Sequence, residues 1–144
     1  MTDAERTALL DALRAEYSAV YAYGVIAAYA SPERVRVVAE HTAAHRARRD
    51  STAEALAAAG ITVPPSDAAY TTPFPVDDPI PAARLAVTVE TDTATAWRAV
   101  VERADTAPTR RTATDALTEA AVRLATWQSI LGTAPATTPF PGGE

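Results

Sequence analysis

The strongest constraint on the fold is an uninterrupted helical face between Val35 and Leu56. Along this stretch, apolar, small and basic residues recur every three or four positions, the spacing of one side of an α-helix: Val35, Val38, Thr42, His45, Arg49, Thr52 and Leu56. The two ends of the face suit a protein core, but its middle carries a histidine and an arginine. Because a buried unpaired charge is costly, this face predicts polar partners on neighbouring helices.

Four amphipathic segments with clear start and stop signals predict an all-α protein. We expect helices over residues 3–30, 32–59, 79–105 and 109–131. Their starts carry a Thr-x-x-Glu capping box, a Ser-Pro-Glu triplet or an Asp-Pro pair, and glycines follow the second and fourth helices. The first two helices are joined by a very short link, which predicts an antiparallel hairpin.

The segment over residues 61–78 is different in kind, because its four prolines exclude regular structure. At about 3.1 Å per residue it spans roughly 55 Å, more than the roughly 40 Å of a 27-residue helix. We therefore expect a crossover that runs the length of the bundle and makes the second and third helices parallel. Residues 1–144 then form a single four-helix bundle, two hairpins joined by this crossover, with an extended tail over residues 133–144.

One five-residue sequence, TTPFP, occurs twice, at residues 71–75 and 137–141. Each copy follows the second helix of a hairpin. The repeat predicts two related halves about a pseudo-twofold axis, with Phe74 and Phe140 as equivalent plugs against the bundle. The alternative is two unrelated proline-rich surface segments.

Composition limits the partners. The net charge is −5, and every basic side chain is an arginine, so nothing favours nucleic acid or an anionic membrane. The chain has no cysteine, which excludes disulfides, thiolate catalysis and iron–sulfur clusters. No apolar run of about 18 residues suggests a membrane span. The N-terminus is charged and periodic, unlike a signal peptide, so we expect a cytoplasmic protein.

Three candidate site residues lie on or beside core-facing helical stripes: Glu16, His45 and Glu90. The segments AEYSAVYAYG (15–24), HRARRD (45–50), TTPFPVDDP (71–79) and PFPG (139–142) resemble the ferritin-like superfamily, and more closely an actinobacterial ferritin-like domain of unknown function. The resemblance covers nearly the whole chain and implies that residues 1–144 are a single ferritin-like four-helix bundle. It implies a carboxylate-bridged iron or manganese site, in which these three residues match ligand positions on the first three helices.

The chain departs from that ligand pattern at two helices. Thr42 stands where a glutamate would precede His45, and Glu119 is followed three positions later by Val122 rather than by histidine. We therefore expect no complete di-iron centre. Instead, the pattern favours a buried ion network of Glu16, His45, Arg49 and Glu90, in which two cationic side chains neutralise two carboxylates.

Three function classes remain open from the sequence. The preferred one is a metal-free structural or interaction protein, homodimeric and not an enzyme, since no nucleophile motif or phosphate loop occurs and catalytic residues are unknown. The second is a degenerate or mononuclear iron or manganese protein using Glu16, His45 and Glu90. The third is a bundle that binds a small molecule near Tyr17, Tyr23 and Trp97. His41 and His45, one helical turn apart, are a further pair that could ligate a divalent ion.

Overall fold

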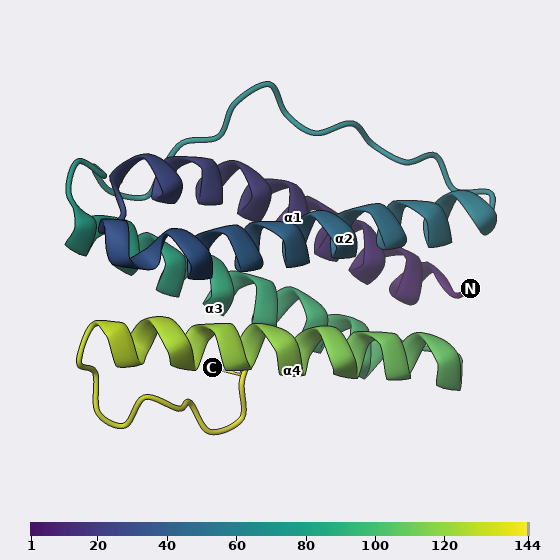
Figure 1. Ribbon diagram of the computed structural model, residues 1–144. Coiled ribbons are helices and arrows are strands. Elements are labelled where there is room, and N and C mark those ends of the chain that lie inside the picture. The colour runs from purple at the N-terminus through teal and green to yellow at the C-terminus, as the bar shows by residue number, and fades with distance from the viewer. Residues whose placement is uncertain (144) are drawn as a thin grey trace.

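A computed structural model describes residues 1–143 and contains four long helices (Figure 1). They are α1 (Asp3–Tyr29), α2 (Val35–Ala58), α3 (Pro79–Arg103) and α4 (Ala107–Ile130), with a short 3-10 helix, η1 (Pro32–Arg34), before α2. No strand occurs within residues 1–143. The prediction of an all-α four-helix bundle is confirmed.

Local capping chemistry explains where the helices begin and end. The Thr2 side chain accepts a hydrogen bond from the Glu5 backbone N–H at 3.2 Å, as the capping-box pattern predicts. The Thr106 side chain caps α4 in the same way, so α4 begins at Ala107 rather than at residue 109. Gly60 and Gly132 both adopt a φ of 74° just after α2 and α4, a left-handed conformation that glycine takes without strain.

The crossover over residues 61–78 runs along the α1–α2 hairpin, back to the end of the bundle where α3 begins (Figure 1). α2 and α3 are therefore parallel, and α3 lies against both α1 and α4. Two tyrosines of α1 fix the crossover in place. The Tyr17 hydroxyl donates to the Pro64 carbonyl at 2.9 Å, and the Tyr21 ring packs on Tyr70 with 5.4 Å between ring centroids.

The core consists of two apolar clusters, one toward each end of the bundle. One is built around Ile26, Leu85 and Trp127, and the other around Leu13, Leu56 and Trp97. Glu16 of α1, His45 of α2 and Glu90 of α3 are fully buried, and each lies between residues of the two clusters along its own helix. The fold thus brings polar groups together at its centre, with apolar packing on both sides.

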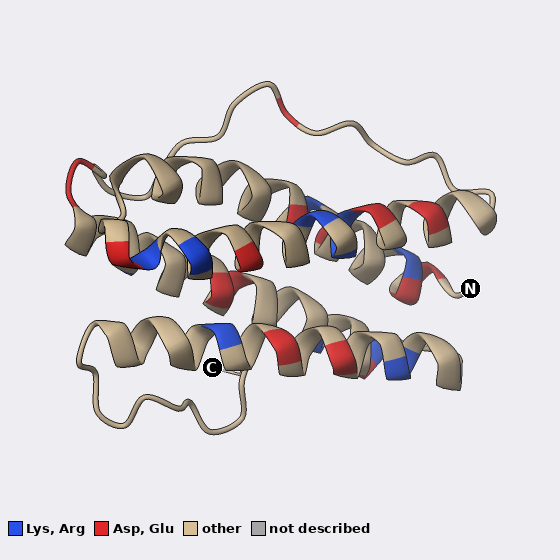
Figure 2. Ribbon diagram, in the orientation of Figure 1, with Lys and Arg blue, Asp and Glu red and all other residues tan. Residues whose placement is uncertain are grey.

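The surface charges are mixed rather than sorted by sign. In the view of Figure 2, acidic and basic residues are interspersed along α2 and α4. Among the helices of the described chain, none is both long and apolar enough to cross a membrane.

The two TTPFP copies pack differently. Phe74 is half-buried and packs against the apolar cluster around Ile26, but Phe140 is 82% exposed, so its prediction as an equivalent plug is wrong. The second copy attaches to α3 through its backbone instead. A Cβ atom at Gly142 would lie only 2.5 Å from the Ala94 carbonyl oxygen, and Arg98 donates to the Phe140 carbonyl at 3.3 Å. This close backbone approach leaves the phenylalanine ring facing outward.

We predict that Gly142→Ala releases the tail from α3. Alanine at this position would clash with the Ala94 carbonyl and would have to adopt a φ of 75°. Limited proteolysis with thermolysin should then cut the tail faster than in the wild type. Gly24→Ala is the matched control, because Gly24 has open space around its Cβ position. This control should stabilise α1 by about 0.5–1 kcal/mol and leave the tail resistant; equal cleavage in both variants would contradict the close approach.

Candidate functional site: a buried ion network

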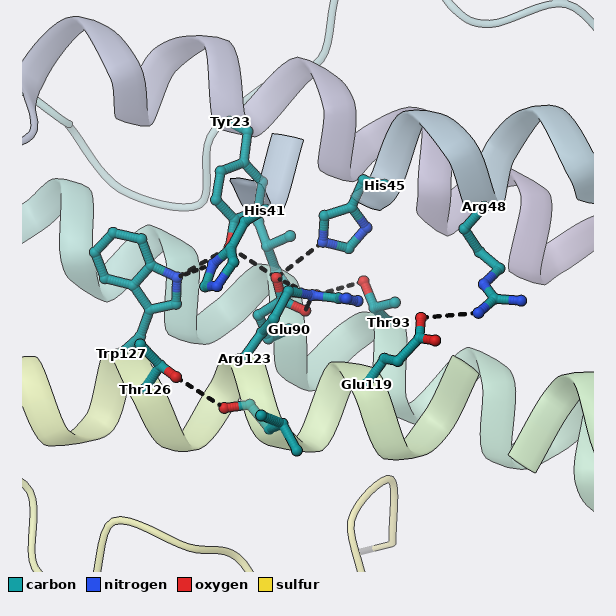
Figure 3. A network of polar contacts seen from close by, with 12 residues as sticks. Tyr23, His41, His45, Arg48, Glu90, Thr93, Glu119, Arg123, Thr126 and Trp127 are labelled. Carbon is teal, nitrogen blue, oxygen red and sulfur yellow. Dashed lines mark hydrogen bonds and ion pairs between the residues drawn. The ribbon is translucent and has the colours of Figure 1, made fainter. Parts of the chain in front are cut away.

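Three fully buried side chains meet at the centre of the bundle, one from each of three helices: Glu16 of α1, His45 of α2 and Glu90 of α3. The two ring nitrogens of His45 face different carboxylates. Nδ1 lies 2.6 Å from Glu16 Oε2, and Nε2 lies 2.8 Å from Glu90 Oε1; Figure 3 shows the second contact. The structure therefore joins the three residues that the sequence placed on separate core-facing stripes.

Both nitrogens of His45 lie at hydrogen-bond distance from a carboxylate oxygen, and the ring can donate to both carboxylates only as an imidazolium. A neutral imidazole carries one N–H and could serve only one of the two carboxylates. Burial by itself lowers the pKa of His45, but the hydrogen bonds and negative charges of Glu16 and Glu90 outweigh it and raise that pKa. A buried positive charge is thus held between two acids.

Arg123 of α4 supplies the second positive charge. Its Nε atom lies 3.1 and 3.0 Å from the two carboxylate oxygens of Glu90, and its side chain is only 11% exposed (Figure 3). Burial raises the pKa of Glu90, yet the contacts with His45, Arg123 and Tyr23 together lower it, so the carboxylate is ionised. Two carboxylates, one imidazolium and one guanidinium then sum to zero charge.

Arg49 does not belong to this network, and its predicted place there is wrong. Its side chain is 29% exposed and donates to Asp50 at 2.7 Å. The reason is geometric: at 3.6 residues per turn, a residue four positions after His45 is rotated by about 40° around the helix. Arg123 was missed, although Ala120, Arg123 and Trp127 follow the three-four spacing of a buried face.

The two glutamates receive a second set of donors in a pseudo-symmetric pattern. The Tyr23 hydroxyl of α1 donates to Glu90 of α3 at 2.7 Å, and the Trp97 indole N–H of α3 donates to Glu16 of α1 at 2.7 Å. In each helix the aromatic residue comes seven positions after the glutamate. In each of the two halves predicted from the TTPFP repeat, an aromatic side chain thus donates to the glutamate of the other half.

His41 and Trp127 extend the network by one further layer. The Trp127 Nε1 atom lies 3.0 Å from both the Tyr23 hydroxyl and His41 Nδ1. Because the Tyr23 proton is directed at Glu90, the Trp127 N–H is the donor here and His41 Nδ1 is an acceptor. Burial lowers the pKa of His41 and keeps it neutral, whereas burial raises the pKa of Tyr23 and keeps its proton in place. The two histidines therefore face different partners and do not converge on one ion.

The residues present do not fit a two-metal centre. A metal-binding imidazole must offer a lone pair, and His45 uses both nitrogens as donors. Thr42 donates to the Val38 carbonyl at 2.7 Å, and Glu119 pairs with Arg48 at 2.8 Å on the surface. Within residues 1–143, no group of three or more histidine, aspartate or glutamate side chains is arranged to hold a metal ion.

The aromatic residues expected near a small-molecule cavity have different polar partners. Tyr23 and Trp97 are at most 1% exposed and use their polar groups within the network. Tyr17 instead faces the crossover through its bond to Pro64. These three side chains therefore do not line a common cavity.

We predict that Arg123→Met lowers the free energy of unfolding by about 3–5 kcal/mol, because it leaves the buried network with one uncompensated negative charge. Arg49→Met is the matched control. Its arginine pairs only with the exposed Asp50, so its loss should change stability by about 0.5 kcal/mol or less. Urea denaturation followed by circular dichroism measures both. Equal effects of the two substitutions would place the second cation elsewhere.

We also predict that the pKa values of the chain's two histidines lie on opposite sides of 6.5, the ordinary value for histidine. The pKa of His45 lies above it and that of His41 below it. Nitrogen-15 NMR of the imidazole rings should show His45 protonated and His41 neutral at pH 7, with His41→Gln giving the assignment. The raised pKa of His45 makes its contribution to the free energy of unfolding complete below pH 6.5. That contribution is lost as the pH rises through the folded-state pKa, by at most about 1.4 kcal/mol per pH unit. A neutral His45 at pH 7 would contradict the charge assignment.

Comparisons with known proteins agree with the fold and give no activity. The chain matches the domain of unknown function DUF4439 over residues 8–144. It is similar to the crystal structure of a conserved hypothetical protein, rv2844, from Mycobacterium tuberculosis, with 44% identity and a TM-score of 0.88, over 90% of this chain and 98% of that chain. No curated protein matches. The expected likeness to an actinobacterial domain of unknown function is confirmed, and the chain belongs to the DUF4439 family.

Proposed function

We propose that this protein is a metal-independent structural or interaction protein and not an enzyme. The observation that carries the proposal is the charge balance around His45. Glu16 and Glu90 are neutralised by an imidazolium and a guanidinium of the same chain, at distances of 2.6 to 3.1 Å. The bundle therefore needs no added cation to hold two carboxylates in its core.

The environment of the network also argues against acid–base catalysis. Glu16, His45 and Glu90 are fully buried, so a substrate has no contact with them. A general acid or base works best with a pKa near the operating pH, where it can change its charge. Here the pKa of Glu90 is lowered and that of Tyr23 is raised, both away from neutral pH, so Glu90 stays ionised and Tyr23 stays protonated. These groups keep fixed charges, which suits a structural role.

The resemblance to the ferritin-like superfamily suggests why two carboxylates lie in the core of this bundle. We propose that His45 and Arg123 take the place of the metal charge that a carboxylate-bridged centre would supply between Glu16 and Glu90. The alternative, a degenerate or mononuclear iron or manganese protein, would require His45 to lose a proton and to leave one of its two carboxylates. It would also leave Arg123 beside the bound cation, where like charges repel.

The predicted homodimer has a suitable surface on the α1–α2 hairpin. A shallow groove of about 330 Å³ lies there, and its lining is mostly alanine and valine, including Ala27, Val38 and Ala39. Val35, at the edge of this groove, is 68% exposed. An apolar face of this kind favours contact between protein surfaces. We propose a second copy of the chain as its partner, which sedimentation velocity measures directly.

We predict that the protein, expressed in medium supplied with iron and manganese, carries far less than one equivalent of either metal. Treatment with a chelator should leave its melting temperature unchanged, because the core charges are already balanced. Elemental analysis and thermal unfolding with and without EDTA test this. Stoichiometric metal that disappears in Glu90→Gln, together with a lower melting temperature after chelation, would overturn the proposal.

A further inference from the structure

Figure 1 shows the crossover running along the outside of the bundle. A second polar site is lined by residues of the crossover, α1 and α3. We define the crossover pocket by six of its lining residues: Ser18, Tyr21, Tyr70, Thr72, Thr88 and Asp92. Its volume is about 240 Å³, enough for a small organic molecule. The contacts of Tyr17 with Pro64 and of Tyr21 with Tyr70 hold the crossover against α1. The side of the pocket that the crossover forms is therefore fixed in position.

Asp92 gives the crossover pocket a negative charge without a counter-ion. No arginine or histidine lines the pocket, and within residues 1–143 Asp92 makes no ion pair. Partial burial raises the pKa of Asp92. A carboxylate in this position is stabilised by any cation that enters the pocket.

Two threonine hydroxyl groups of the pocket present acceptors. Thr88 donates its proton to the Arg84 carbonyl at 3.2 Å, and Thr72 donates to the Phe74 carbonyl at 2.9 Å. Since each hydroxyl has only one proton, the two oxygens can offer only lone pairs to a ligand. Together with Asp92, they favour a ligand that is a hydrogen-bond donor.

The aromatic pair supplies a second attraction for positive charge. The rings of Tyr21 and Tyr70 lie 5.4 Å apart at an angle of 54° and both line the pocket. The face of a tyrosine ring carries partial negative charge and attracts an ammonium group within about 6 Å. The same rings give apolar contact to the methylene groups of an alkyl chain.

We propose that the crossover pocket binds a small organic ammonium ion. Asp92 is its counter-ion, the hydroxyl oxygens of Thr72 and Thr88 accept its N–H groups, and the tyrosine pair covers its carbon chain. This site goes beyond the proposed function, because it lies outside the buried network and does not depend on whether the core binds metal.

The test uses n-butylammonium chloride as the probe and n-butanol as a neutral molecule of similar size. Titration at pH 7.5 and constant ionic strength, followed by protein NMR shifts, should show saturable binding of butylammonium and binding of butanol that is at least about tenfold weaker. Asp92→Asn should weaken butylammonium binding by about tenfold or more, and Tyr21→Leu by a smaller factor. Binding should also weaken as the pH falls through the raised pKa of Asp92.

Asp115→Asn is the matched control, because Asp115 is an exposed aspartate on α4 and does not line the pocket. It should bind butylammonium like the wild type. Circular dichroism checks that every variant is folded. The proposal is overturned if butylammonium does not saturate, if butanol binds equally well, or if Asp92→Asn binds like Asp115→Asn. Each of these outcomes is independent of the metal analysis of the core.

Discussion

The imidazolium of His45, held between Glu16 and Glu90, is the contact on which the arrangement of the four helices depends. It links α2 to α1 through one ring nitrogen and to α3 through the other, and Arg123 then ties α4 to the same carboxylate. Each of these groups would be costly to bury alone. Any other register between the helices would separate at least one charge from its partner, so the network specifies how the bundle is assembled. The apolar clusters on either side supply the packing but are less selective about register.

The sequence predicts much of this arrangement because helical periodicity reports which side of a helix is buried. The face through Val38, His45 and Leu56 indicates a histidine in the core, and the same reasoning places Glu16 and Glu90 on core-facing stripes. Periodicity does not report which neighbouring helix delivers a partner. It therefore favours Arg49, which lies near His45 in the chain, over Arg123, which comes from a helix that is distant in sequence. The prolines of residues 61–78 and the length that this segment can span predict the long crossover. The crossover in turn predicts that α2 and α3 are parallel.

The two halves of the chain share a plan and differ in detail. The crossed contacts, Tyr23 with Glu90 and Trp97 with Glu16, repeat the same spacing in α1 and α3. The second hairpin, however, contributes an arginine where the first contributes a histidine to the network. The TTPFP segments differ as well: the first packs Phe74 against the core, and the second is followed by Gly142, whose backbone rests on α3. A sequence repeat predicts common ancestry of the segments, but their contacts depend on the helices that each one meets.

Both tryptophans of the chain donate their indole N–H to this polar centre, Trp97 to Glu16 and Trp127 to Tyr23 and His41. Their emission is therefore sensitive to the charge and hydration of the groups that hold the helices together. The protein therefore carries a built-in optical probe, with both indoles in direct hydrogen-bond contact with titratable groups of the network. Intrinsic fluorescence can follow the state of the network in the unmodified chain, without a label and without a ligand.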